Sequence, residues 1–124
     1  NFIENNNLYL SIGTPEMYSQ QIRKLAQDDN YYYGKILKIN IEEFTKPELK
    51  NVEIYSKGHR NPQGLIIYDN FILSTEHGPY GGDEINMIEY NQNYGWPISS
   101  YGTKYSKNDK EGSELGESFK FDHR

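Results

Sequence analysis

The sequence contains no cysteine, which excludes disulfide bonds and thiolate chemistry within the chain. It also has no apolar run near the roughly 18 residues of a membrane-spanning helix. Positive charge is scarce: 13 Lys and Arg stand against 18 Asp and Glu, a formal net charge of -5 with no basic stripe. Nucleic acid is therefore not an expected partner, and the acidic surface suits cations or neutral solutes better.

Apolar residues are sparse as well. The hydrophobic set makes up 35% of the chain, and it includes 12 tyrosines. This composition favours a strand-rich fold with partly exposed tyrosines, or a fragment whose core continues in further sequence. Frequent β-branched and aromatic residues argue against disorder. A chain of 124 residues that begins with Asn and lacks a signal peptide is expected to be a processed or excised piece, inside one domain.

The pattern of alternating apolar residues and turn residues predicts several short strands. Asp69-Asn70, between two β-rich runs, predicts a two-residue hairpin. The expected strands are residues 8–13, 31–41, 52–56, 64–68, 71–75 and 84–89. Residues 15–30 predict a short helix or a polar loop, and the tail 104–124 predicts a polar loop or the start of a further blade. The pattern alone indicates an all-β fold: a sandwich, a barrel or propeller blades.

Two polar, glycine-rich blocks, residues 58–64 and 76–97, flank the hairpin, and we expect both at the same end of the sheet. We also expect residues 58–97 to run from the inner strand of one blade into the next blade. Loops of this composition carry function when a rigid scaffold positions them.

The first block presents Arg60 and Asn61. A guanidinium matches carboxylates, and Pro62 restrains Asn61 to an extended backbone, so the pair suits a planar anionic ligand. The alternative is that Arg60 binds backbone carbonyls or a carboxylate of its own loop.

The second block, Glu76 to Glu84, combines a Gly-Pro pair, further glycines and the acids Asp83 and Glu84. Ca²⁺ takes six to eight oxygen ligands, including backbone carbonyls, which such a loop can supply. The alternative is a tight turn whose acids face solvent.

Four other residues of the blocks have simpler interpretations. His59 is expected to be a hydrogen-bonded loop histidine, because no metal-binding histidine spacing is present. His77 borders the candidate cation site, and Tyr94 can offer its carbonyl to a cation. Trp96, between Gly and Pro, is expected to pack its loop against the core.

Together these blocks resemble one family. GHRNPQG at 58–64, EHGPYGGDEIN at 76–86 and NYGWP at 93–97 follow AQD at 26–28 and GK at 34–35. In this order and spacing they resemble the soluble quinoprotein sugar dehydrogenases, the glucose/sorbosone dehydrogenase family, and above all its bacterial aldose sugar dehydrogenase branch.

The resemblance implies that residues 1–124 form about two to three blades of a six-bladed β-propeller that holds pyrroloquinoline quinone (PQQ) and oxidises aldose sugars at C1 to lactones. Arg60, Asn61 and Tyr105 would contact PQQ. It also implies an external electron acceptor and a periplasmic or secreted location.

The resemblance further implies two calcium ions. The carbonyls of Gly78 and Pro79 would bind the calcium next to the quinone, and Glu84 and Tyr94 would hold a second, structural calcium. The family's catalytic histidine would lie before residue 8, so no catalytic residue is assigned and this segment alone is expected to be inactive. The competing interpretation is a non-catalytic, calcium-stabilised propeller module that binds a glycan or a protein.

Overall fold

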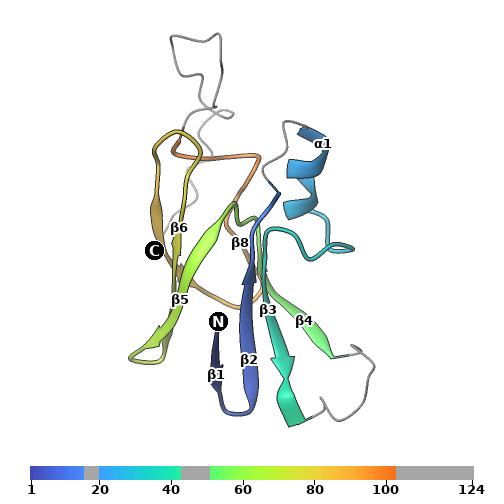
Figure 1. The fold of residues 1–124 in the computed structure, drawn as a ribbon, viewed down its shortest axis with the longest axis vertical. Helices are drawn as coiled ribbons and strands as arrows, with labels where there is room; N and C mark the ends of the chain where they lie inside the picture. Colours follow the sequence, from blue (N-terminus) through green and yellow to red (C-terminus); the bar gives the residue numbers. More distant parts are fainter. Residues whose placement is uncertain (16–19, 43–50, 103–124) are drawn as a thin grey trace, which may run out of the picture.

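The computed structural model describes residues 1–15, 20–42 and 51–102 (Figure 1). Strands dominate this part of the chain, as predicted. Its elements are β1 (Phe2–Glu4), β2 (Asn7–Ile12), α1 (Gln20–Arg23), the 3-10 turn η1 (Lys24–Ala26), β3 (Lys35–Asn40), β4 (Val52–Lys57), β5 (Pro62–Tyr68), β6 (Phe71–Glu76), β7 (Glu84–Ile88) and β8 (Gln92–Asn93).

The strands form two sheets, one with the order β1-β2-β3-β4-β8 and one with the order β5-β6-β7. All neighbours are antiparallel except β4 and β8, which pair in parallel through Ser56 with Gln92 and Lys57 with Asn93. The chain therefore leaves the first sheet after β4, builds the second sheet, and returns to β4.

The chain leaves the first sheet from β4 to enter β5. Among the strands of the first sheet, β2 and β1 make the most contacts with β5. Departure from the inner strand of a blade stays a prediction.

Asparagine and aspartate build the two tight hairpins. Asn5 and Asn6 have φ of 48° and 61°, and Asp69 and Asn70 have φ of 46° and 65°. Two successive residues of positive φ match the twist of two-residue hairpins, and these side chains tolerate that conformation. The predicted Asp69-Asn70 hairpin is confirmed, with Tyr68 opposite Phe71.

Other boundaries differ from expectation. The strand predicted from residue 31 begins only at Lys35, because Tyr31, Tyr32 and Tyr33 are exposed and a turn at Tyr33-Gly34 precedes the strand. β1 and β8 were not predicted. The short helix within 15–30 is confirmed by α1 and η1. The tail 104–124, predicted as a polar loop or the start of a further blade, lies outside the described residues.

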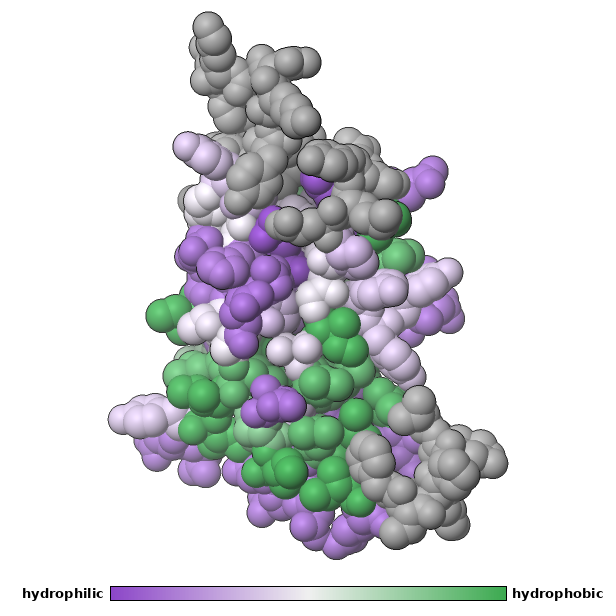
Figure 2. Space-filling model, in the orientation of Figure 1, coloured by the Kyte–Doolittle hydropathy of each residue, from purple (hydrophilic) through white to green (hydrophobic). Residues whose placement is uncertain are grey.

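The main core lies between the two sheets. Tyr9 and Ile36 come from the first sheet, and Leu65, Ile72 and Ile88 come from the second. Figure 2 shows a band of apolar side chains across the lower half of the molecule, with polar side chains above it and along the bottom edge. Within the described ranges, no helix is long and apolar enough to cross a membrane.

Candidate functional site

The two polar blocks meet at one end of the second sheet, as predicted. Pro62 at the start of β5 pairs with Glu76 at the end of β6, which in turn pairs with Glu84 at the start of β7. The His77 amide also donates a hydrogen bond of 3.1 Å to the carbonyl of Asn61. Antiparallel pairing therefore brings the residues before β5, after β6 and before β7 together.

A small cavity of about 20 Å³ lies where the blocks meet. Four of the predicted binding residues line it: Arg60, Gly78, Glu84 and Tyr94. A volume of roughly 10–15 Å³ measured in this way holds one water, so the cavity has room for a single water or ion. The other lining residues are Gly58, Glu76, His77, Trp96, Ser99 and Ser100.

Arg60 is half-buried and already bonded to its neighbours. Its Nη1 donates a hydrogen bond of 2.9 Å to the carbonyl of His77, and its guanidinium lies 5.5 Å from the centroid of the Trp96 ring. The alternative of binding to a backbone carbonyl is thus observed. The proposed contact with a planar anion stays a prediction.

Asn61 does not line this cavity. Its Oδ1 accepts a hydrogen bond of 2.9 Å from Gln63 Nε2, and its carbonyl accepts the His77 amide. Gln63 of β5 therefore holds the side-chain amide of Asn61, and the second block holds its backbone carbonyl. Tyr105 lies outside the described residues.

The Gly78–Gly82 loop crowds backbone oxygens together. A Cβ on Gly78 would lie 2.5 Å from the carbonyl oxygen of Gly82 and closer still to that of Gly81. The Gly78 amide donates a hydrogen bond of 3.0 Å to Asp83 Oδ1, which fixes the loop. Pro79 is buried against Gly102, where a Cβ would meet Pro79 Cδ at 2.7 Å. This oxygen-rich loop fits a hard cation.

Acidic side chains alone do not complete a cation site. Among residues 1–15, 20–42 and 51–102, no three His, Asp or Glu side chains group as metal ligands. A cation here would therefore depend on backbone carbonyls as well, and both predicted calcium sites, Gly78 with Pro79 and Glu84 with Tyr94, stay predictions. Glu84 is half-buried, and its Oε2 accepts a hydrogen bond of 3.0 Å from Asn86 Nδ2.

Tyr94 is fixed by both ends of its side chain. Its ring stacks on His59 with centroids 4.7 Å apart. Its hydroxyl donates a 2.5 Å hydrogen bond to the Met87 carbonyl and accepts a 2.9 Å one from the Glu89 amide. Burial raises the pKa of Tyr94 to about 12, so the phenol stays neutral. Its side chain is thus structural, and any cation contact would use its carbonyl.

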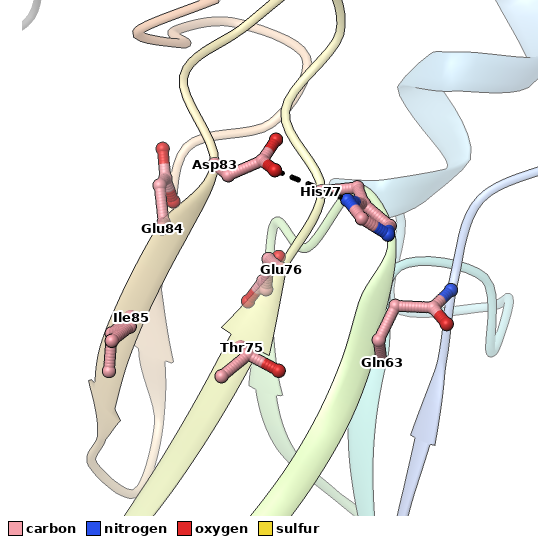
Figure 3. Close-up of a pocket in the computed structure, with 7 residues that line it drawn as sticks. All are labelled: Gln63, Thr75, Glu76, His77, Asp83, Glu84 and Ile85. Atoms are coloured by element: carbon pink, nitrogen blue, oxygen red, sulfur yellow. Dashed lines mark hydrogen bonds and ion pairs between the residues drawn. The ribbon is translucent and has the colours of Figure 1, made fainter.

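A larger cavity of about 230 Å³ opens beside β6 and β7 (Figure 3). In it His77 Nδ1 lies 3.4 Å from Asp83 Oδ2. Pockets that bury a whole cofactor are usually about 300–1,000 Å³, so this cavity would form only part of such a site. Its lining residues are Gln63, Thr75, Glu76, His77, Asp83, Glu84 and Ile85.

Two further predictions are confirmed. His59 is fully buried and hydrogen-bonded to Ser56 and Glu76. Trp96 is buried and packs against Ala26.

Sequence reasoning missed the contributions of Glu76 and Asn86, both of which are buried. The alternation of side chains along each strand could have identified these two residues. Glu76 lies on the same face as buried Ile72, and Asn86 on the same face as buried Ile88.

Comparisons with known proteins agree with this site. The sequence model of the family described as Glucose / Sorbosone dehydrogenase matches residues 1–120. Aldose sugar dehydrogenase YliI of Escherichia coli is 39% identical over 93 residues, which cover 68% of this chain and 25% of that protein.

Solved structures agree as well. The apo form of the soluble aldose sugar dehydrogenase of Escherichia coli matches with a TM-score of 0.68 and 34% identity, over 83% of this chain and 31% of that one. The PQQ-bound aldose sugar dehydrogenase of Streptomyces coelicolor matches with a TM-score of 0.61 and 30% identity. The match covers 87% of this chain and 30% of that one.

The chain spans less than a third of the length of these relatives. The fold prediction, an all-β segment of a β-propeller, is confirmed. The chain belongs to the glucose/sorbosone dehydrogenase family.

Proposed function

We propose that the full-length protein containing this chain is a PQQ- and calcium-dependent dehydrogenase that oxidises aldose sugars at C1 to lactones. The observation that supports this most directly is the cavity that Arg60, Gly78, Glu84 and Tyr94 line together. These residues come from both polar blocks, which carry the family's motifs, and the matched family is one of sugar dehydrogenases.

Arg60 and Asn61 would bind the planar, anionic cofactor. A guanidinium pairs with carboxylates through parallel N–H donors, and PQQ is a tricarboxylate. The face of Trp96 beneath Arg60 restricts where that guanidinium can lie. Gly13 packs against the Asn61 backbone, since a Cβ there would lie 3.4 Å from Asn61 Cα. Tyr105 would add a third contact to the cofactor.

The carbonyls of Gly78 and Pro79 would hold one calcium ion, and Glu84 with the Tyr94 carbonyl would hold a second. The half-buried carboxylate of Glu84, which lines the cavity together with Gly78 and Tyr94, supports these assignments. When bound, PQQ would supply the electron-accepting carbonyl and Ca²⁺ the positive charge that stabilises negative charge developing on it.

In the overall reaction the sugar loses a hydride from C1 and a proton from its C1 hydroxyl. The two electrons pass to an external acceptor. We assign the general base to a histidine outside this sequence, so the residues of this chain bind and orient rather than move the proton. A periplasmic or secreted location belongs to the same proposal.

One observation favours the alternative of a non-catalytic module. Arg60 Nη1 donates to the carbonyl of His77, so a contact within the chain already holds this guanidinium. A propeller that keeps calcium for stability and binds a glycan or a protein would retain this arrangement.

The deciding experiment titrates the full-length protein with PQQ at saturating Ca²⁺, and then measures aldose oxidation with an artificial electron acceptor. Saturable PQQ binding and lactone formation are expected. A folded, calcium-bound protein that binds no PQQ would overturn the dehydrogenase and support the non-catalytic module.

A further inference from the structure

Three buried side chains form a hydroxyl–imidazole–carboxylate triad next to the site. Ser56 Oγ lies 2.8 Å from His59 Nε2, and His59 Nδ1 lies 2.5 Å from Glu76 Oε1. An ionised carboxylate only accepts, so Nδ1 carries the proton, and in the neutral imidazole Nε2 accepts from the Ser56 hydroxyl. The exposed fractions of Ser56, His59 and Glu76 are only 1%, 0% and 7%. A substrate cannot reach this hydroxyl, so the triad is not a nucleophilic site.

The network continues from Glu76 to both binding blocks. Glu76 Oε2 accepts a hydrogen bond of 3.3 Å from the Arg60 amide. Glu76 Oε1 accepts one of 3.2 Å from Asn86 Nδ2, and the same nitrogen donates one of 3.0 Å to Glu84 Oε2. Asn86 is 3% exposed. One amide group therefore joins the buried carboxylate of Glu76 to the half-buried carboxylate of Glu84, and both residues line the cavity.

The chemistry of this arrangement explains why an amide lies at position 86. Glu76 and Glu84 are direct neighbours across β6 and β7, and like charges opposite each other repel. The two hydrogens of the Asn86 nitrogen satisfy one oxygen of each carboxylate and set the direction of both. A buried polar chain whose members are all bonded specifies one arrangement, because every broken bond leaves a buried group unsatisfied.

We propose that His59, Glu76 and Asn86 are positioning residues that hold Arg60 and Glu84 in their binding geometry. Asn86 acts on Glu84 through its side chain, and Glu76 acts on Arg60 through the backbone amide. His59 and Asn86 do not line the cavity, and Glu76, which does, is bonded at both of its carboxylate oxygens. The inference rests on the proposed function only in that Glu84 is taken as a ligand of Ca²⁺.

The first test measures cation affinity in the full-length protein, with Ca²⁺ by calorimetry and with Tb³⁺ by luminescence. Asn86→Leu keeps the number and branching of the side-chain heavy atoms and removes both donors. Loss of a residue that orients a metal ligand typically costs about 10–100-fold in metal affinity, and we expect a weakening in this range.

The matched control is Ser74→Ala. Ser74 pairs with Asn86 across the sheet and is fully buried, but its hydroxyl has no hydrogen-bond partner in the part of the chain that is described. The cation affinity of the Ser74→Ala variant should stay within about twofold of the wild-type value. Should leucine prevent folding, Asn86→Ser retains one donor and should weaken binding by an intermediate factor.

The second test needs no ligand. Amide hydrogen exchange is measured at Arg60, whose N–H is bonded to Glu76, and at Gly78, whose N–H is bonded to Asp83 outside the network. Glu76→Gln and Asn86→Leu should each accelerate exchange at Arg60 about tenfold or more and leave Gly78 unchanged, because a weaker or displaced acceptor opens that bond more often.

The outcomes separate the two proposals. A wild-type protein that binds neither Ca²⁺ nor Tb³⁺ would refute the cation site, while faster exchange at Arg60 in the variants would still support the positioning role. Unchanged exchange at Arg60 would overturn that role. If the wild type binds the cation, equal cation affinities of Asn86→Leu and Ser74→Ala would also overturn the positioning role.

Discussion

Arg60 Nη1 donates a hydrogen bond of 2.9 Å to the carbonyl oxygen of His77. This bond joins the two polar blocks through a side chain, in addition to the backbone bond between His77 and Asn61. Contacts within the chain therefore orient Arg60. A guanidinium carries five N–H donors, so one such bond does not preclude a further contact with a carboxylate.

This arrangement makes Arg60 the clearest probe of cofactor binding. In the full-length protein, Arg60→Ala should weaken PQQ binding by about 1.5–3 kcal/mol, the usual cost of losing a charged hydrogen-bonding partner. That corresponds to roughly one to two decades in dissociation constant. Arg60→Lys keeps the positive charge but loses the planar pair of N–H donors. The affinity of this variant for PQQ should therefore fall between those of wild type and Arg60→Ala. Titration at saturating Ca²⁺ measures this effect, and equal affinity for wild type and Arg60→Ala would contradict the assigned contact.

Calcium should stabilise the full-length protein through Glu84. A cation that binds only the native state raises stability by mass action, by about 2.7 kcal/mol at one hundred times its dissociation constant. The melting temperature should rise with Ca²⁺ and fall with a chelator, and Glu84→Ala should shrink that shift. Glu89→Ala is the control, because Glu89 is an exposed acid just after β7 that does not line the cavity. Identical melting curves with Ca²⁺ and with chelator would remove the calcium assignment.

Two adjacent glycines separate backbone strain from steric crowding in the same loop. Gly81 and Gly82 have φ of 74° and 69°, so alanine is strained at both by about 1–2 kcal/mol. A Cβ on Gly81 would meet nothing within 4 Å, whereas one on Gly82 would lie 2.6 Å from the backbone carbon of Tyr101. Gly82→Ala should therefore lower the melting temperature clearly more than Gly81→Ala, and should also reduce the calcium-dependent shift. Equal losses would mean that the loop relaxes away from residues 101–102.

The fold was predictable where local chemistry decides it. Asp69-Asn70 encodes its hairpin through side chains that tolerate positive φ, and the confirmed pairing of Tyr68 with Phe71 follows from that turn. β8 is different. It consists of only Gln92–Asn93 and pairs in parallel with β4, far away in the sequence. A two-residue segment carries no periodicity, so its pairing depends on tertiary structure.

The site was predictable to the same extent. Hairpin geometry places residues 58–64 and 76–84 at one end of the sheet, and the family motifs predict which of them bind. The contact of His59 with Glu76 could not be predicted, because it joins the turn after β4 to the end of β6 and depends on how the two sheets pack.

Lys35 gives a pH-dependent test of the structure behind the site. Its side chain is buried, and its Nζ donates to the carbonyls of Leu25, Ala26 and Tyr33 at 3.0, 2.9 and 3.0 Å. It thereby ties η1, whose Ala26 packs against Trp96, to β3. Burial lowers the pKa of Lys35 from 10.5 to about 8, against the opposing attraction of Asp29.

The sign of the effect on stability follows from proton binding. Between pH 8 and 10.5 the unfolded chain keeps the Lys35 proton while the native state has lost it. Stability rises with pH wherever the unfolded state binds more protons, here by up to about 1.4 kcal/mol per pH unit. The full-length wild type should thus gain stability relative to Lys35→Met over this range, and the difference in their melting temperatures should shift in favour of wild type. Below pH 7 the difference should be constant. A difference that does not change between pH 8 and 10.5 would show that the Lys35 ammonium keeps its ordinary pKa, held by its three carbonyl partners.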